Sequence, residues 1–330
     1  MKVSVLVTFY NQEKYVDDAL QSIFSQKCDF DFEVLIGDDG STDATIEKIK
    51  HWQEVYPDRI RLYIMERNPK VKYNGSQRAS RNRLNLLKHV QGEYFLFLDG
   101  DDFYTDENKL KRQVEILDNP QNADYVMCAH NVYSYDEKTG ANTPFLNKRK
   151  VLRLKAAEYW GHYYFHPDSI MIRSKYISKI PTDIIVDYFN DNMITFCFLK
   201  YGGVYYLPDI MASYRQTGDG IWTGNSEFVG KLRNLMDLDL EFKIFPQLYK
   251  YSLIRHRADI HYFVTSKGQN DEKKVLFYEK QIQQDKLEYA GAWLQYNLKI
   301  QKMNGRMGKQ YVQAWFLYIF YHVLWLLTGH

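Results

Sequence analysis

The chain has 330 residues, of which 45% are hydrophobic, and 43 Lys and Arg against 41 Asp and Glu give a formal net charge of only +2. This length is enough for one large core with an appended subdomain, and the balanced charge argues against a nucleic-acid partner. The three cysteines form no CxxC pair, which indicates reduced cytoplasmic thiols rather than disulfides or a zinc site. The apolar run at residues 3–7 is too short for a signal peptide, so we expect no export.

Strand-like and helix-like segments alternate through the first hundred residues. Apolar, largely β-branched runs predict strands at residues 2–9, 32–37, 60–65 and 94–98, and helical spacing of apolar residues predicts helices over residues 11–26, after Asp43 and over residues 77–90. We expect Asp43 to cap the second of these helices. The alternation predicts a mainly parallel sheet with helices on both faces, whose ligands bind beyond the carboxyl ends of the strands.

The alternation weakens after Tyr125. A strand candidate at residues 124–135 leads into a polar, basic loop at residues 136–150, and mixed segments continue as far as residues 202–215. From about Ser226 onward the pattern is typical of helices. We therefore predict an α/β domain over residues 1–225 and a helical region over residues 226–330.

Polar clusters follow three of the predicted strands, at residues 8–11, 38–41 and 99–102. The last cluster, DGDD, places three carboxylates within four positions, which is usually tolerated only where a cation lies among them. An exposed acidic turn is the structural alternative, because Asp and Gly are common turn formers. A calcium loop is excluded, because Tyr104 and Leu110 stand where that motif has Gly and Glu.

The sequence lacks the glycine-rich loops that commonly bind phosphates. It has no GxxxxGK[ST] motif, and TFYNQ stands after the first strand where a dinucleotide-binding protein has GxGxxG. A P-loop ATPase and a dinucleotide-dependent dehydrogenase are therefore disfavoured. A hard divalent cation held by Asp99 and Asp101 is the standard alternative for binding a diphosphate.

Several ordered segments together carry a family resemblance: VSVLVTFYNQEKYVDDALQSIFSQ, VLIGDDGSTDAT, ASRN, GEYFLFLDGDD and YGGVYYLPDIMASYR. Over about residues 3–215 they resemble the family 2 glycosyltransferases. The resemblance implies a GT-A fold, which is a Rossmann-like mixed sheet with helices on both faces. It also implies an inverting, metal-dependent transfer of a hexose or N-acetylhexosamine from a UDP-sugar to a hydroxyl of a glycan or lipid-linked glycan acceptor. The family's habits suggest bacterial surface polysaccharide or a teichoic-acid-like polymer.

The resemblance assigns the nucleotide pocket to the first two strand ends. Thr8, Phe9 and Tyr10 would line the uracil site, with Tyr10 nearest the base, and Asp39 or its neighbour Asp38 would accept a hydrogen bond from the uracil ring nitrogen. A carboxylate that accepts from a ring N–H discriminates between bases, and an aromatic wall supplies stacking. The two Asp residues also suit a turn before a helix.

The same resemblance assigns the DGDD segment to the metal. Asp101 would be the more direct ligand of a Mn²⁺ or Mg²⁺ ion that bridges the two phosphates, while Asp99 would contact the cation site and the ribose or donor sugar. Asp102 would hold a metal-bound water. Arg81 and Asn82 match the family's Arg-Asn pair, and Arg81 would steady the donor sugar and the carboxylates.

An inverting transfer needs a carboxylate that takes the proton of the acceptor hydroxyl. By position in the resemblance this base is Asp191, preceded by Asn190 where the family usually has Glu. Residues after Asp191 have helical spacing, so a plain helix cap is the alternative role for this side chain. Asp187 is the second candidate for the base.

Further along the chain, Arg215 would pair with phosphate oxygens, and Trp222 would stack on a sugar or nucleotide. Residues 216–218 are Gln, Thr and Gly where some relatives have a metal-binding His, so we expect no His ligand there. His166 and Asp168 lie where the acceptor usually enters and would contact its hydroxyls. A structural His is the alternative at that position.

The most apolar stretch of the chain is residues 314–327, which is too short to span a membrane. Two interpretations of residues 311–330 stay open: a helix in the interface of an anionic membrane, or a helix in a core or homo-oligomer. The expected location is accordingly the cytoplasm, with peripheral contact to the inner face of the cell membrane under the first interpretation.

Two other functions are alternatives to a glycosyltransferase. A non-catalytic nucleotide-sugar or glycan binding protein with the same fold is suggested by Asn190 and by Leu84, which stands where the family usually has Gly. It predicts nucleotide binding without turnover. A nucleotidyltransferase also uses metal-bound carboxylates, but it usually opens with a glycine-rich loop and a basic residue, and VTFYNQE has neither.

Overall fold

The computed structural model describes residues 1–66, 70, 75–156, 158–159 and 163–218, with five isolated positions further on. The chain divides into two compact units, and the first comprises residues Met1–Tyr159 and Tyr163–Gly224. Apart from those isolated positions, the predicted helical region at 226–330, its segment 311–330, and Trp222 lie outside the described residues. Among the helices that are described, none has the length and apolar character needed to cross a membrane.

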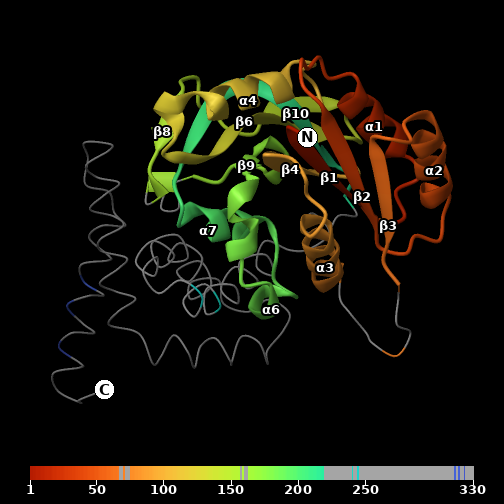
Figure 1. Ribbon diagram of the computed structural model, residues 1–330. Coiled ribbons are helices and arrows are strands. Elements are labelled where there is room, and N and C mark those ends of the chain that lie inside the picture. The colour runs from red at the N-terminus through yellow and green to blue at the C-terminus, as the bar shows by residue number, and fades with distance from the viewer. Residues whose placement is uncertain are drawn as a thin grey trace. The chain divides into compact units, whose positions relative to one another are not determined.

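The first unit is built on a mixed ten-stranded sheet (Figure 1). Its strands are β1 Val3–Phe9, β2 Phe32–Asp38, β3 Ile60–Ile64, β4 Tyr94–Asp99, β5 Phe103–Tyr104, β6 Tyr125–Asp136, β7 Ala141–Pro144, β8 Leu152–Leu154, β9 Met171–Arg173 and β10 Gly203–Gln216. They lie in the order β3-β2-β1-β4-β9-β6-β10-β5, with β7 beside β6 and β8 beside β10. The first four strands are parallel, as predicted.

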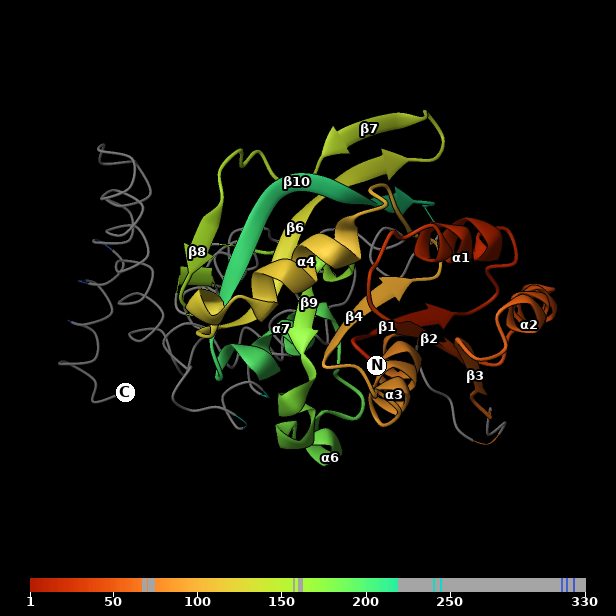
Figure 2. The same cartoon turned by 45° about the horizontal axis from the view of Figure 1, so that its top comes forward.

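Helices cover both faces of this sheet (Figures 1 and 2). The described helices are α1 Val16–Phe24, α2 Thr45–Val55, α3 Gly75–Leu87, α4 Lys109–Asp118, α6 Thr182–Ile185 and α7 Asp191–Leu199, with 3₁₀ turns η1 Pro120–Asn122, η2 Pro167–Ser169 and η3 Ser174–Lys179. In the figures α1, α2 and α4 lie on one face, and α3, α6 and α7 lie on the other. The predicted α/β architecture is therefore confirmed.

Both faces of β1 are covered, and its side chains point to them alternately, which explains why five of its seven residues are apolar. Val3, Val5 and Val7 belong to a cluster with the buried face of α1, and Leu6 points to the opposite face of the sheet. On that opposite face Phe95 of β4 lies 5.5 Å, centroid to centroid, from a phenylalanine of α7. Full burial of each such side chain stabilises the fold by about 1.5–3 kcal/mol.

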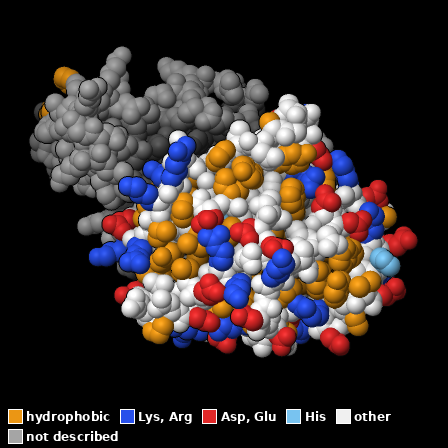
Figure 3. All heavy atoms as spheres, turned by 90° about the horizontal axis from the view of Figure 1, so that it is seen from above, with side chains coloured by type: hydrophobic (Ala, Val, Ile, Leu, Met, Phe, Trp, Pro, Cys, Tyr) orange, Lys and Arg blue, Asp and Glu red, His pale blue; other side chains and the backbone are white. Residues whose placement is uncertain are grey.

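The second half of the sheet departs from the parallel pattern. Strand β9 lies between β4 and β6 and is antiparallel to both, and β5 is antiparallel to β10. Strand β9 has three residues and β5 has two. Strands this short leave no periodic pattern in the sequence. The face of the molecule in Figure 3 carries acidic and basic side chains interspersed, in keeping with the small net charge.

Candidate active site

The carboxyl ends of β1, β2 and β4 lie side by side, as predicted. In the register of the sheet Thr8 lies opposite Asp99, and Phe9 lies opposite Asp38. The Thr8 hydroxyl donates to Asp99 at 3.3 Å. Gly100 follows Asp99 directly beneath the ring of Phe9, where an added Cβ would lie 2.2 Å from the ring. Only glycine fits this close approach, so packing against Phe9 explains the glycine between Asp99 and Asp101.

At the nucleotide end of the site, the structure separates the roles of the two neighbouring Asp residues. Asp38 is buried, and its carboxylate accepts hydrogen bonds from the backbone N–H and the hydroxyl of Ser41 at 2.7 and 2.5 Å. Asp39 lies nearer the surface, where Arg78 donates to its carboxylate at 2.5 Å. The Arg78 guanidinium also lies 4.7 Å from the ring centroid of Tyr10, which is 42% exposed. Tyr10 and Asp39 therefore face one partly open surface.

The second helix of the sequence analysis begins as expected at this edge. Asp43 accepts a hydrogen bond from the backbone N–H of Thr45, the first residue of α2, at 3.0 Å. It also accepts from the N–H of Glu13 at 3.1 Å. The N-cap position of α2 is held by Ala44, without a side-chain capping hydrogen bond, so Asp43, the predicted cap, lies one residue before that position and ties the start of α2 to the loop after β1.

The DGDD carboxylates form a poorly neutralised cluster. Burial and the charge of Asp99 raise the pKa of Asp101 to about 7. Burial and the charge of Asp168 raise the pKa of Asp102 well above its ordinary value. Burial also raises the pKa of Asp99, although Arg83 opposes this shift. A cation bound among these groups would remove much of the cost of ionising them.

Arg215 makes two hydrogen bonds to the DGDD turn. Its backbone N–H donates to the carboxylate of Asp102 at 2.6 Å, and its Nε donates to the carbonyl of Asp101 at 2.8 Å. The guanidinium also pairs with Asp18 at 2.9 Å and lies 4.8 Å from the ring centroid of Tyr15. These contacts support the turn, and the predicted contact of Arg215 with phosphate oxygens stays a prediction.

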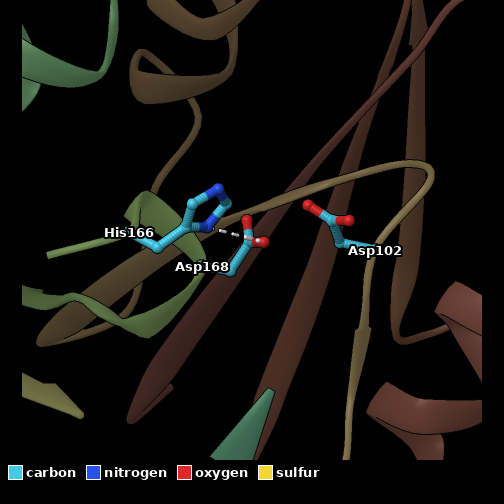
Figure 4. A group of neighbouring side chains, drawn as sticks. All are labelled: Asp102, His166 and Asp168. Carbon is cyan, nitrogen blue, oxygen red and sulfur yellow. Dashed lines mark ion pairs between the residues drawn. The ribbon is translucent and has the colours of Figure 1, made fainter. Parts of the chain in front are cut away.

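His166 and Asp168 lie beneath the same turn (Figure 4). One Asp168 carboxylate oxygen accepts from the backbone N–H of Asp99 at 3.2 Å, and the other lies 3.1 Å from Nδ1 of His166. Asp168 lies between the His166 ring and Asp102, and one ligand atom from each of the three lies within 4.8 Å of the others. Burial opposes ionisation of Asp168, but His166 lowers the pKa of its carboxyl.

The two residues predicted to contact the acceptor are thus deeply buried, at 6% exposure for His166 and 0% for Asp168. Burial disfavours charge on the His166 ring, yet Asp168 raises its pKa. Asp168 contacts the DGDD turn, and His166 contacts Asp168 and the ring of Tyr214. The acceptor role stays a prediction.

The candidate base lies at the start of α7. The side chain of Asn190 accepts from the backbone N–H of Met193 at 3.0 Å, so Asn190 caps this helix. Asp191 is therefore not the cap of this helix, so the capping alternative for its carboxylate does not hold. Its side chain is 36% exposed, and the Tyr164 hydroxyl donates to it at 3.4 Å.

Arg83 joins the Asp191 carboxylate to the DGDD segment. Its guanidinium is 8% exposed and lies 2.9 Å from Asp99 through Nη2 and 2.9 Å from Asp191 through Nη1. Although burial opposes it, Asp99 and Asp191 raise the pKa of Arg83. Arg81, which the sequence analysis assigned to the carboxylates, instead donates to Asp187 at 2.7 Å. The second candidate base is thus paired with a different arginine.

Arg83 and Arg78 contact site carboxylates but were not among the residues predicted from the sequence. Positions 81 and 83 are two residues apart on α3, which places their side chains on different sides of the helix. Between them, Asn82 points to the sheet and donates to the carbonyl of Gly37 at 2.8 Å. Arg83 follows Asn82 directly on α3, and both side chains are buried. Arg83 could therefore have been predicted only once Asn82 was known to face the sheet.

The site offers two sets of ligands that fit a divalent cation. Asp99 and Asp101 provide hard carboxylate oxygens at the strand end, which suit Mg²⁺ or Mn²⁺. Asp102, His166 and Asp168 form a deeper cluster, in which Asp102 Oδ2 is buried without a hydrogen-bond partner in the described part of the chain. The raised pKa of Asp101 also fits a group that ionises fully only beside a cation.

Fold and site together define a GT-A protein, with carboxylates at the strand end and a further carboxylate on a helix beside them. Residues 4–180 match the family model described as glycosyl transferase family 2. This match covers more than half of the 330 residues, and the chain belongs to glycosyltransferase family 2.

Relatives and solved structures agree with this assignment. An uncharacterized protein of Mycobacterium tuberculosis is 30% identical over 224 residues, which are 67% of this chain and 60% of that protein. The poly(ribitol-phosphate) beta-N-acetylglucosaminyltransferase TarS of Staphylococcus aureus is 36% identical over 121 residues, 36% of this chain and 19% of TarS. The structure of TarS residues 1–349 in complex with UDP has a TM-score of 0.60 at 17% identity, covering 98% of this chain and 91% of that one, which shows the shared fold.

The match therefore spans about 60% of the length of the mycobacterial relative.

Proposed function

We propose that the protein is a metal-dependent inverting glycosyltransferase that moves a hexose or N-acetylhexosamine from a UDP-sugar to a hydroxyl of a glycan or polyol-phosphate acceptor, in bacterial surface polysaccharide biosynthesis. The observation that carries the proposal is Arg83, which contacts a DGDD carboxylate and Asp191 at 2.9 Å each. One buried arginine thus fixes the donor end and the base relative to each other. A plain acidic turn has no need of such a link.

Asp191 acts in this proposal as the general base. As the acceptor oxygen forms its bond to the anomeric carbon, the bond from that carbon to the diphosphate oxygen breaks, and UDP leaves from the opposite face. Asp191 takes the hydroxyl proton. The Tyr164 hydroxyl and Arg83 orient this carboxylate through separate oxygens, at 3.4 and 2.9 Å.

Asp101 and Asp99 would hold the Mn²⁺ or Mg²⁺ ion. When bound, such a cation supplies positive charge that stabilises the departing diphosphate. The chain's own part is to present two carboxylates in a fixed turn, which Arg215 and Asp168 hold through the contacts at 2.8 and 3.2 Å. A rigid turn limits the reorganisation that accompanies cation binding.

The uracil pocket lies between Tyr10 and Asp39 in this proposal, with Thr8 and Phe9 at its floor. Tyr10 stacks on the base, and Asp39 accepts from the ring N–H, because the buried Asp38 already accepts two hydrogen bonds from Ser41. A UDP donor is also supported by TarS, whose structure of similar fold was determined with UDP. The polyol-phosphate acceptor is suggested by the poly(ribitol-phosphate) in the name of TarS.

The test is calorimetric titration of UDP, GDP and CMP into the protein with and without Mn²⁺, repeated with Asp101→Asn. We expect UDP to bind best, with Mn²⁺ raising its affinity about tenfold or more in the native protein and not in the variant. A set of UDP-sugars with acceptor then tests turnover. Equal binding of all three nucleotides, or an equal effect of Mn²⁺ on both proteins, would contradict the proposal. Binding of UDP without turnover of any donor would favour the non-catalytic alternative.

A further inference from the structure

The loop between β7 and β8 carries three consecutive basic residues, Lys148, Arg149 and Lys150, which we call the basic loop. All three side chains are exposed. In the described part of the chain none of them forms an ion pair, although other surface cations such as Lys14 and Lys48 do. Three adjacent cations concentrate positive charge on one exposed loop, which attracts anions and does so more strongly at low salt.

The backbone of this loop is anchored to the sheet. The side chain of Asn131 on β6 makes two hydrogen bonds to the backbone of Leu146, donating to its carbonyl at 2.7 Å and accepting from its N–H at 2.9 Å. The Tyr206 hydroxyl on β10 donates to the carbonyl of Lys148 at 3.4 Å. The N–H of Phe145 donates to β6 at 2.9 Å. The charges are therefore presented from a fixed backbone.

Aromatic side chains connect the loop to the candidate base. Phe145 lies 6.0 Å, centroid to centroid, from Tyr164, whose hydroxyl contacts Asp191. The Lys148 ammonium lies 5.7 Å from the ring centroid of the neighbouring Tyr163. Cations, aromatic faces and a carboxylate thus form one connected set of contacts. Aromatic faces pack against the apolar side of sugars and polyols, and the cations suit an anion.

We propose that the basic loop binds the acceptor, and that this acceptor is a polymer with phosphodiester groups along its backbone. The inference rests on the proposed function, since it takes Asp191 as the base. A single exposed cation contributes little to binding in water, but several cations facing a polyanion act together and weaken as salt is added. A neutral glycan would gain nothing from these charges.

The test compares two triple variants. The first is Lys148→Gln with Arg149→Gln and Lys150→Gln, and the matched control is Lys88→Gln with Lys175→Gln and Lys179→Gln. The control lysines are also exposed. Lys175 follows Ser174, whose N–H donates to Glu93 just before β4, at the far end of that strand from Asp99. The acceptor probes are a ribitol-phosphate oligomer and a phosphate-free oligosaccharide.

We expect the loop variant to raise KM for the ribitol-phosphate oligomer about tenfold at low salt, with the control variant unchanged. KM for the UDP-sugar and acceptor-independent release of UDP should match the native protein in both variants. For the native protein, KM for the oligomer should rise with salt until the difference from the loop variant disappears.

An unchanged KM for the oligomer in the loop variant would overturn the inference. So would an equal loss with the phosphate-free acceptor, or a loss only of binding to vesicles rich in anionic lipid, which would assign the loop to a membrane surface. Calorimetric titration of the oligomer into the UDP- and Mn²⁺-bound protein tests the loop without turnover. Failure of the native protein to turn over any UDP-sugar would instead count against the proposed function alone.

Discussion

The two halves of the sheet contribute differently to the site. The parallel strands β1 to β4 end in the side chains that would contact the nucleotide and cation, such as Tyr10, Asp39 and Asp99. Elements later in the chain supply groups that reach back to those strand ends, among them Asp168 from η2 and Arg215 from β10. In the proposed function the first half carries the ligand-facing groups, and the second half helps to fix their geometry. Asp191 is the exception, because it is the proposed base and comes from the second half.

The largest effect is expected for Asp191→Asn, which tests that exception. Asparagine keeps the shape of the side chain but cannot accept the proton, so kcat should fall by roughly 10²–10⁴. Affinity for UDP in the presence of Mn²⁺ should stay within about twofold of the native value, since the base lies outside the predicted nucleotide pocket. Steady-state kinetics and calorimetry measure the two quantities.

Asp187→Asn is the matched control for this variant, because Asp187 lies four residues earlier and pairs with Arg81. Its kcat should stay within about threefold of the native value. If Asp187→Asn were the variant that lost kcat, the base would be reassigned to the residue that the sequence analysis ranked second.

Arg83→Gln breaks the link between the two halves directly. It leaves Asp99 and Asp191 without the cation that they share at 2.9 Å, and loss of one partner of a buried ion pair costs about 3–5 kcal/mol of unfolding free energy. Urea unfolding should show this loss, together with a fall in kcat. Added Mn²⁺ and UDP should recover part of the stability, because the cation neutralises Asp99 in place of the arginine.

The matched variant Arg81→Gln removes a half-exposed pair and should cost about 1 kcal/mol or less. If Arg83→Gln and Arg81→Gln lowered the unfolding free energy equally, the link that Arg83 forms between Asp99 and Asp191 would not be important for stability.

The parallel half was largely predictable from the sequence, because long buried strands and amphipathic helices leave strong periodic signals. Asp99 and Asp38 could be placed at one edge from topology alone. Two further features could not be predicted. In the second half, strand β9 has only three residues, too few to leave a periodic signal. On α3, the choice between Arg81 and Arg83 follows only from the inward direction of Asn82, which donates to Gly37 of β2. Likewise, only the structure shows that Asn190 takes the capping role from Asp191.

Asp168→Asn tests the support beneath the metal motif. The variant keeps an oxygen to accept from the N–H of Asp99 but loses the charge that pairs with His166 at 3.1 Å. Because Asp168 is fully buried, we expect a loss of about 1–3 kcal/mol in unfolding free energy. Mn²⁺-dependent affinity for UDP should weaken as well, as the turn loses its fixed geometry.

Asp136→Asn provides the control, since Asp136 also accepts from backbone N–H groups, at 2.8 and 3.1 Å, but in the turn before β7. It should cost about 0.5 kcal/mol or less and leave UDP affinity unchanged. A loss of stability in Asp168→Asn with native UDP affinity would show that this network supports the fold and not the site.

A lysine buried near Asp168 should make the stability of the protein depend on pH. Lys109 on α4 donates to Gln113 at 3.0 Å, and burial lowers its pKa to about 7, although Asp168 and Cys128 oppose the shift. His130, whose own pKa is lowered by burial and by Lys109, also faces this group. The unfolded chain has the ordinary lysine pKa near 10.5, so between pH 7 and that value it binds more protons than the folded chain.

Stability should therefore rise with pH over this window, by up to about 1.4 kcal/mol per pH unit from this one group. Below pH 7 the cost of burying the ammonium is fully present, and near pH 10.5 it has disappeared. Lys109→Met should flatten the dependence, whereas Lys111→Met, which removes an exposed lysine paired with Asp29, should leave it unchanged. Urea unfolding at pH 7, 8 and 9 measures the slope. An identical slope in Lys109→Met and the native protein would show that the buried lysine is not the group that titrates.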